Sequence, residues 1–495
     1  MTRVRLGALA GVVGFLAFVE FTSGFLQGYY TPMLSDIARH LEVPDADVNW
    51  LEGSQLMLSA LVVPVLAKLG DMVGHKRILL WSTGVTALAT LALPFATTFP
   101  LFLAAWTLQG VYVVWLPLEI ALIWSRTRDR EGRSLLTARA AGALVAALEA
   151  GAISGALIGG ALIDALPITG VLLIPGLLVL VCLAVIAFGV AESPVQLGGR
   201  IDVVGLALVT VALLAFTGGL GLLRVQGVAN PVPWAVVVLG LLLFVPFARW
   251  ELRHPDPLID VRLFRSPALA PVFATAALFG MSVLGAQAPL STFIRTDPST
   301  AGYGLGIGGF LTSLVIGAYL IAMVAGALAY PLAARVSTPR NALAAAALLV
   351  ALGYLLFLPF HTTYAHMVTN MVIAGLGSGA LVAALPAAAA SGAPPHLTGV
   401  ATGLTNSTKT VGGAVASAIF GIALMHGVAE AAGVGGAADG AVAGGTAGSF
   451  AGYVVVWCVC GGSALVAAVA LRFAVPEDAF RDPVGVERER PRGRR

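Results

Sequence analysis

Fourteen stretches of apolar residues, each long enough to cross a lipid bilayer, fill most of this 495-residue chain. A helix needs about 20 apolar residues to cross about 30 Å of hydrocarbon, so fourteen helices use about 280 residues and leave short loops. The mean hydropathy of +0.92 indicates that most of the surface faces lipid. The sequence therefore predicts an all-α polytopic membrane protein with little room for a soluble domain. The expected spans cover residues 7–30, 50–67, 78–97, 100–124, 138–163, 168–190, 203–223, 233–250, 268–293, 305–333, 341–360, 364–390, 400–426 and 448–473.

The basic residues fall almost entirely on one side of these spans. With fourteen spans both termini share a side, and 24 of the 28 lysines and arginines lie there. Arg39, Arg224 and Arg295 lie on the opposite side, and Lys409 falls inside a span. Because basic residues in short loops mark the cytoplasmic side, the pattern predicts cytoplasmic N- and C-termini. The strong excess of arginine over lysine is typical of a GC-rich bacterial genome, so we expect a bacterial inner membrane.

Four charged residues fall inside the expected spans, where each costs at least about 2.5 to 3.5 kcal/mol and is therefore a candidate functional residue. Glu20 and Glu149 lie near mid-membrane, Glu119 lies in the cytoplasmic third of the fourth span, and Lys409 lies in the inner half of the thirteenth. Burial disfavours the charged form of a carboxyl group, so such a glutamate can carry a proton or exchange it for a cationic substrate. A permanently protonated glutamate, or a structural bridge between Lys409 and a carboxylate, is the alternative.

Sequence signatures of enzymes are absent or incomplete. Residues 403–410 nearly spell a phosphate-binding loop, but Thr408 replaces the required second glycine and no strand precedes it. Residues 304–309 satisfy the dinucleotide fingerprint in letters only, without a βαβ unit. We therefore expect no enzyme activity, no metal, no cofactor and no nucleic-acid partner, and a proton gradient as the energy source.

The loop at residues 70–77 carries the most informative motif of the chain. Asp71, Gly74, Lys76 and Arg77 resemble the signature loop of the major facilitator superfamily, although Ala67 stands where that motif begins with glycine. The resemblance implies that this loop clamps the cytoplasmic ends of the helices in one conformation. It also implies that the aspartate lies near a helix N-terminus and that the basic residues pair across the interface between two halves. A basic turn that only sets topology would explain the two basic residues but not the aspartate and glycine.

Further motifs resemble the fourteen-helix drug:proton antiporter branch of that family. The segments 250–265 and 398–404 resemble its central linker and its thirteenth span. Gln109 matches another family motif, but Trp106 replaces its arginine, and Ala156 replaces the proline of the antiporter-associated glycine motif. Four glycines of the fifth span share one helix face, where close packing of helices is equally expected. These glycines are Gly151, Gly155, Gly159 and Gly160.

The resemblance implies two pseudo-symmetric six-helix halves, at residues 1–190 and 267–475. Residues 191–266 would add two transmembrane helices and a cytoplasmic linker, and residues 476–495 a disordered basic cytoplasmic tail. It implies that the first and fourth helices line the central cavity, so that Glu20 and Glu119 face water and substrate. Further candidates for cavity contacts are Gln27, Tyr29, Tyr30, Gln109, Trp115 and Asn406.

The function implied by this resemblance is export of lipophilic drug-like or natural-product compounds, including antibiotics, in exchange for protons by alternating access. The expected partners are thus a small lipophilic substrate, protons and the lipid bilayer. Proton-coupled uptake or uniport of a small metabolite is an alternative, because two antiporter-associated residues are missing. A membrane-embedded sensor is a remoter alternative, since it would need an output domain that the sequence lacks.

Overall fold

The computed structural model describes residues 2–127, 133–192, 202–255, 257–393, 398–433, 447–473 and 475, and these residues form helices and connecting turns without any strand. The expected tail at residues 476–495 lies outside the described residues. The helices are α1 (Thr2–Tyr29), α2 (Leu34–His40), α3 (Val48–Val73), α4 (His75–Ala92), α5 (Phe99–Gln109), α6 (Trp115–Arg126), α7 (Arg133–Ile163), α8 (Ile168–Gly189), α9 (Val203–Gln226), α10 (Pro231–Glu251), α11 (Ala270–Val283), α12 (Gln287–Arg295), α13 (Pro298–Ala301), α14 (Gly309–Val336), α15 (Pro339–Leu355), α16 (Tyr364–Gly392), α17 (Thr398–Gly433) and α18 (Phe450–Phe473).

The long helices have the length and composition of membrane spans. Within the described residues, twelve helical segments are long and apolar enough to cross a bilayer, and α15 is a shorter apolar helix. Two of the twelve are broken: α5 and α6 are joined by a 3₁₀ segment, η4 (Gly110–Val114), and α11 and α12 are separated by a turn. The all-helical membrane fold is confirmed, whereas the number fourteen stays a prediction, because it also needs α1 and α15 to cross.

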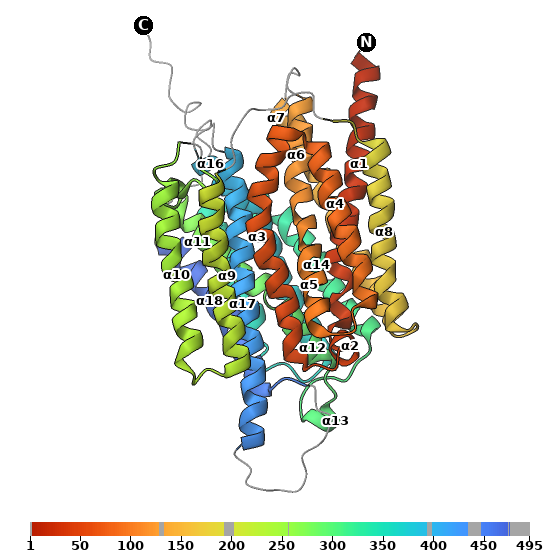
Figure 1. Cartoon of the computed structure of the whole chain (residues 1–495), viewed down its shortest axis with the longest axis vertical. Helices are drawn as coiled ribbons and strands as arrows, with labels where there is room; N and C mark the ends of the chain where they lie inside the picture. Colours follow the sequence, from red (N-terminus) through yellow and green to blue (C-terminus); the bar gives the residue numbers. More distant parts are fainter. Residues whose placement is uncertain are drawn as a thin grey trace.

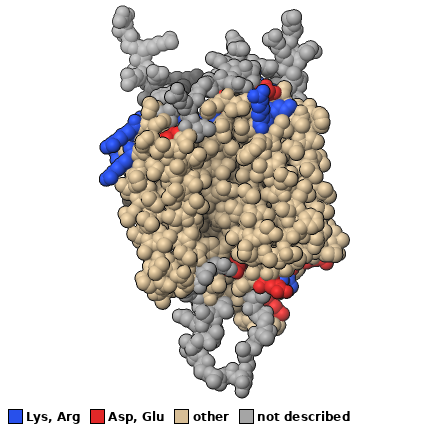
Figure 2. Space-filling model, viewed as in Figure 1, with Lys and Arg blue, Asp and Glu red and all other residues tan. Residues whose placement is uncertain are grey.

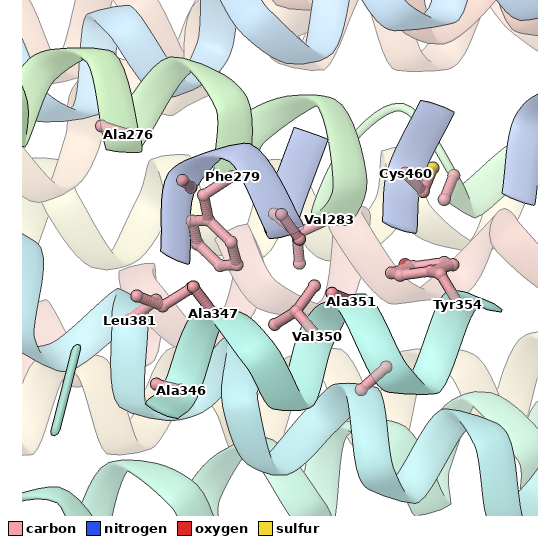
Figure 3. Close-up of a cluster of buried hydrophobic side chains, with 14 of the residues drawn as sticks. Ala276, Phe279, Val283, Ala346, Ala347, Val350, Ala351, Tyr354, Leu381 and Cys460 are labelled. Atoms are coloured by element: carbon pink, nitrogen blue, oxygen red, sulfur yellow. The ribbon is translucent and has the colours of Figure 1, made fainter. Parts of the chain in front are cut away.

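Buried apolar side chains form two large clusters that follow the order of the chain. The first is built mainly from α1 to α8, and we call these helices the first bundle. The second is built mainly from α11 to α18, which we call the second bundle. Figure 3 shows part of the second cluster, where Phe279 of α11 points toward Leu381 of α16 and Ala347 of α15. The expected boundaries of the two halves stay a prediction.

Helices α9 and α10 pair with each other and lie against α3 and α17, at one side of the molecule (Figure 1). Their contact is apolar: Met57 of α3, Phe247 of α10 and Ala414 of α17 share one small buried cluster. These two helices therefore cover the seam at which the first and second bundles meet.

The two ends of the molecule differ in charge. We call the end at which α1 begins and α18 ends the terminal face, and the opposite end, where α1 ends, the distal face (Figure 1). Figure 2 shows lysine and arginine side chains mainly near the terminal face and acidic side chains mainly near the distal face, with an almost uncharged band between them. Such a band matches the hydrocarbon layer of a bilayer.

Candidate functional site

Two glutamates are buried together inside the first bundle. Glu20 of α1 and Glu119 of α6 are both 0% exposed, and their carboxyl groups interact with each other. Apart from this mutual contact, none of their four oxygens has a hydrogen-bond partner among the described residues. The thiol of Cys182 lies within electrostatic range of both glutamates, and the hydroxyl of Tyr112 lies within electrostatic range of Glu20. The pair is thus a polar site in an apolar environment, shielded from solvent in this conformation.

The other two intramembrane charges lie on opposite bundles. Glu149 belongs to α7 of the first bundle and Lys409 to α17 of the second, and each affects the other electrostatically. They form no ion pair within 4.0 Å, and neither side chain has a hydrogen bond within the described part of the chain. Lys409 and Asn406 together line a small recess of the second bundle, whose other walls include Phe279, Leu381 and Leu385.

The signature loop is held within the first bundle in this conformation. The carboxylate of Glu192, just after α8, accepts hydrogen bonds from the backbone N–H of Lys76 at 2.9 Å and of Arg77 at 3.1 Å. The Lys76 ammonium donates to the carbonyl oxygen of Ala187 at 2.8 Å. Glu192 therefore caps the N-terminus of α4, and the role near a helix N-terminus that the resemblance implied for Asp71 stays a prediction. The pairing across the interface implied for the basic residues is not the arrangement seen here.

The structure also shows what Asp71 contacts and why residue 74 is a glycine. The Asp71 carboxylate lies 3.1 Å from the imidazole Nε2 of His75, four residues later and beyond the turn at Gly74, and the Asp71 side chain is 47% exposed. Gly74 has φ of +119°, which a residue with a side chain rarely adopts, and a Cβ there would lie 2.6 Å from the Glu192 carboxyl carbon. Glycine at this position therefore lets α3 turn directly into α4 and leaves room for Glu192.

The glycines of α7 lie where this helix contacts its neighbours. A Cβ on Gly151 would lie 2.0 Å from the carbonyl oxygen of Phe21 in α1, so the two backbones are in contact. Gly160 faces the second bundle instead, where a Cβ would lie 2.5 Å from the carbonyl oxygen of Gly309 in α14. The four glycines are Gly151, Gly155 and Gly159 toward α1 and Gly160 toward α14. These glycines therefore allow close packing of α7 against α1 and α14. The antiporter role of this motif stays a prediction.

The aromatic and amide candidates are mostly buried in the first bundle. The Tyr29 hydroxyl donates to the carbonyl oxygen of Val171 in α8 at 2.8 Å. The Gln109 amide donates to the hydroxyls of Tyr30 and Thr90 at 3.1 and 3.0 Å. Trp115, at the start of α6, is 0% exposed, whereas Gln27 is exposed. Asn406 is the one of the six candidates that lies beside Lys409. Their roles in substrate contact stay predictions.

A fourth membrane carboxylate, Glu52 of α3, was missed by the sequence analysis. It is the third residue of the expected span 50–67, where an acidic residue is typical of the edge of a loop. Its carboxylate accepts a hydrogen bond from the backbone N–H of Ala288, in the first turn of α12. The break between α11 and α12 creates this free helix N-terminus inside the membrane, and only the structure shows that a carboxylate of the first bundle reaches it.

An ion-pair network closes the distal face. The Arg295 guanidinium at the end of α12 lies 2.6 Å from both carboxylate oxygens of Asp36 in α2 and 3.6 Å from Asp164 after α7. Asp164 also accepts hydrogen bonds from the backbone N–H of Gly309 and Phe310 at the start of α14, both at 2.9 Å. Burial raises the pKa of the Asp36 carboxyl above its usual value, although Arg295 and Arg39 oppose this. Two loops of the first bundle are thereby joined to two helices of the second.

A polar hollow of about 440 Å³ lies over this network at the distal face, lined among others by Arg39, Asp45 and Asp297. It differs from the site of the Glu20 and Glu119 pair in chemistry as well as in position, because its walls carry several charges of both signs. We interpret it as a solvent-filled entrance above the closed end rather than as the substrate site.

Comparison with known proteins adds the family. A family model described as Major Facilitator Superfamily matches residues 16–417. The cephamycin export protein CmcT of Amycolatopsis lactamdurans is 28% identical over 80% of this chain and 80% of its own length. The uridine/deoxyuridine transporter of Lactococcus lactis is 23% identical over 63% and 64% of the two chains. Among solved structures, the peptide-transporter family member PepTSo has a TM-score of 0.65 at 14% identity and covers 94% of this chain and 97% of its own. Further relatives are named as a probable actinorhodin transporter, a multidrug efflux pump and a tetracenomycin C resistance and export protein.

Proposed function

Because this chain belongs to the Major Facilitator Superfamily, we propose that it exports lipophilic drug-like or antibiotic compounds in exchange for protons. Membership makes it a multi-pass membrane transporter and not an enzyme. The relatives named as export proteins for cephamycin and tetracenomycin C, and the one named as a multidrug efflux pump, favour export of a lipophilic drug-like compound over other substrates. The Arg-rich terminal face and the bacterial relatives favour a bacterial inner membrane with the terminal face in the cytoplasm.

The buried pair of Glu20 and Glu119 is the observation that carries the proton coupling. Two neighbouring carboxyl groups in an apolar site cannot both be ionised without a large cost, so the pair retains a proton unless water or a cation enters. A conformational change that opens the site to one side of the membrane lets this proton leave or enter. The pair thus has the property that a proton carrier needs.

The contacts between the bundles support alternating access, with the distal face closed and the terminal face open in this conformation. Close contacts between bundles lie toward the distal face: Arg295 with Asp36, Gly160 with Gly309, and Gly53 of α3 with Ser417 of α17. At the terminal face, the signature loop contacts α8 of its own bundle. Figure 2 shows a recess in the half of the drawn face nearer the termini. This is the inward-facing state if the terminal face is cytoplasmic.

The proton gradient supplies enough free energy for such a cycle. One proton entering down a potential of about 100 mV yields about 2.3 kcal/mol, and a difference of one pH unit adds about 1.4 kcal/mol. At about 1.4 kcal/mol per decade, their sum sustains a solute gradient of roughly several hundredfold. One titrating carboxyl pair therefore suffices, and ATP is not needed.

The test is transport in proteoliposomes with the membrane potential clamped by potassium and valinomycin, so that only a pH gradient drives exchange. We use tetramethylrhodamine and its methyl ester as fluorescent probes, since they differ only in the carboxylate. The wild type should move at least one of them against its gradient when the trans side is acidic. Glu20→Gln and Glu119→Gln should retain only downhill exchange, because an amide cannot exchange a proton.

The matched control is Glu42→Gln, which makes the same chemical change at an exposed residue of the distal face and should leave transport unchanged. Uphill transport that persists in both Glu20→Gln and Glu119→Gln would remove this pair from the coupling mechanism. The relative named as a uridine/deoxyuridine transporter favours a second candidate, proton-coupled uptake or uniport of a small metabolite. Uptake of labelled uridine, with no proton-dependent efflux of either dye, would favour that alternative.

A further inference from the structure

Lys409 is a half-buried cation that lies in a recess of the second bundle. Its side chain makes no hydrogen bond and no ion pair within the described residues, and the amide of its neighbour Asn406 is likewise without a side-chain hydrogen bond there. Both belong to one face of α17, three residues apart, so their polar atoms point into the same space. An ammonium group held at this depth without a direct ion-pair or hydrogen-bond contact is costly, and proteins retain such groups where they act on a ligand.

The walls of the recess define what fits. α17 contributes the polar residues Thr405, Asn406 and Lys409, and the other walls are apolar side chains of α11 and α16, with Phe279, Leu381 and Leu385 among them. Phe279 and Leu381 lie against each other in Figure 3. About 30 Å³ of the recess is open to the centres of water-sized groups, which is about twice the 10–15 Å³ that holds one water molecule. One small functional group therefore fits here, while the body of a larger molecule must extend into the space between the bundles.

The charge opposite this recess comes from the other bundle. Glu149 of α7 is the acidic group that acts on Lys409 electrostatically, yet the two are more than 4.0 Å apart and do not pair. Tyr319 of α14, also within electrostatic range of Glu149, lies on the side of the second bundle that faces it. A separated positive and negative group on facing walls matches a molecule that carries both charges, one at each end.

We propose that Lys409 and Asn406 bind the carboxylate of a zwitterionic amphiphile, whose cationic end faces Glu149. The ammonium and the amide N–H donate to the two carboxylate oxygens, which is the arrangement that a carboxylate prefers. The apolar body of the substrate lies on the wall formed by Phe279 and Leu385. This assignment rests on the proposed function for the transport step, and it narrows the lipophilic substrates to those with a free acid group and a positive charge.

Binding in detergent, with no gradient present, tests the proposal independently of transport. The probes are tetramethylrhodamine, a zwitterion, and its methyl ester, a cation with the same ring system; affinity is read from the fluorescence anisotropy of each dye. The wild type should bind the acid more tightly than the ester. Lys409→Gln should weaken binding of the acid at least 10-fold and leave the ester within about twofold, whereas Lys409→Arg should retain binding of the acid, because the charge is kept.

The controls separate a ligand site from a structural role. Lys68→Gln removes a lysine from the end of α3, outside the recess, and should change neither affinity. Glu149→Gln should weaken both dyes, because both carry the cationic ring. If Lys409→Gln weakens the acid and the ester equally, Lys409 serves the structure and the proposal is wrong. If the acid and the ester bind equally well to the wild type, the recess does not bind the carboxylate and the proposal is wrong. Proton-driven transport of the ester would still support the proposed function.

Discussion

At the scale of single residues, Glu192 caps the N-terminus of α4, a contact that the motif at residues 71–77 does not indicate. It lies 116 residues from Lys76 in the chain, so no local pattern connects the two. The motif itself was recognised from the residues at 71, 74, 76 and 77, and the glycine at 74 has a backbone reason in its φ of +119°. What the sequence could not supply is the partner, because a hydrogen bond between distant segments depends on how α4 and α8 pack.

Replacing Glu192 by alanine should therefore loosen the start of α4. Two backbone N–H groups, of Lys76 and Arg77, lose their acceptor, and loss of a cap typically costs about 1 kcal/mol of helix stability. Hydrogen–deuterium exchange of a peptide covering residues 74–80 should be several-fold faster in Glu192→Ala than in the wild type. The exposed Glu42→Ala is the matched control, and unchanged exchange in Glu192→Ala would mean that this carboxylate does not hold the loop.

At the scale of helices, apolar length predicted the positions of the spans but not their breaks. Apolar length alone placed the expected span 168–190 on α8 and 364–390 on α16, because only an internally hydrogen-bonded helix crosses a bilayer. The interruption between Val283 and Gln287 has a local cause: Pro289 has no N–H to donate to the carbonyl of Gly285, and its ring crowds that carbonyl. What the sequence could not show is the partner of the new N-terminus of α12, because the contact with Glu52 depends on how α3 packs against α12.

The contact between α1 and α7 gives a prediction at this scale. A methyl group at Gly151 would lie 2.0 Å from a backbone oxygen of α1, so Gly151→Ala must push the helices apart. Overpacking of this kind costs about 1 to 3 kcal/mol, and the melting temperature in detergent should fall by several degrees. Gly142, earlier in the same helix, has nothing within 4 Å of the position that a Cβ would take. Gly142→Ala should leave the melting temperature unchanged or raise it, since alanine favours the helix by about 1 kcal/mol. Equal melting temperatures for both variants would contradict the close packing.

At the scale of the whole molecule, the closed distal face joins the bundles through groups that respond to protons. Asp36 is held against Arg295 of α12, with Arg39 on its own helix, Asp164 after α7 and Asp45 before α3 as the other charges around it. The network brings together Asp36 of α2, Arg295 of α12 and Asp164 after α7, which are far apart in the sequence. Sequence analysis placed Arg295 on the outer side but had no means to pair it, since Asp36 lies 259 residues away.

This network predicts that acid on the distal side favours closure. Burial raises the pKa of Asp36 in the closed state, and opening exposes the carboxyl to water, where its pKa returns toward the usual value. The closed state therefore binds the proton more tightly, so closure is strongest at low pH and is lost as the pH rises through the raised pKa. In an antiporter this sign is useful, because a proton arriving from outside would drive the step back toward the inward-facing state.

Distances between spin labels on His40→Cys and Thr300→Cys, in a background without the native cysteines, measure this closure directly. The short-distance population should grow as the pH falls in the wild type, whereas Asp36→Asn should make the population nearly independent of pH over the same range. Asp297→Asn is the matched control: this exposed carboxyl lies on the same rim, and hydrogen bonds from Ser299 lower its pKa, so it stays charged and cannot cause the effect. If acid opens the distal face of the wild type, the predicted pH dependence of closure is wrong. Protonation of Asp36 would then act by breaking its ion pair with Arg295.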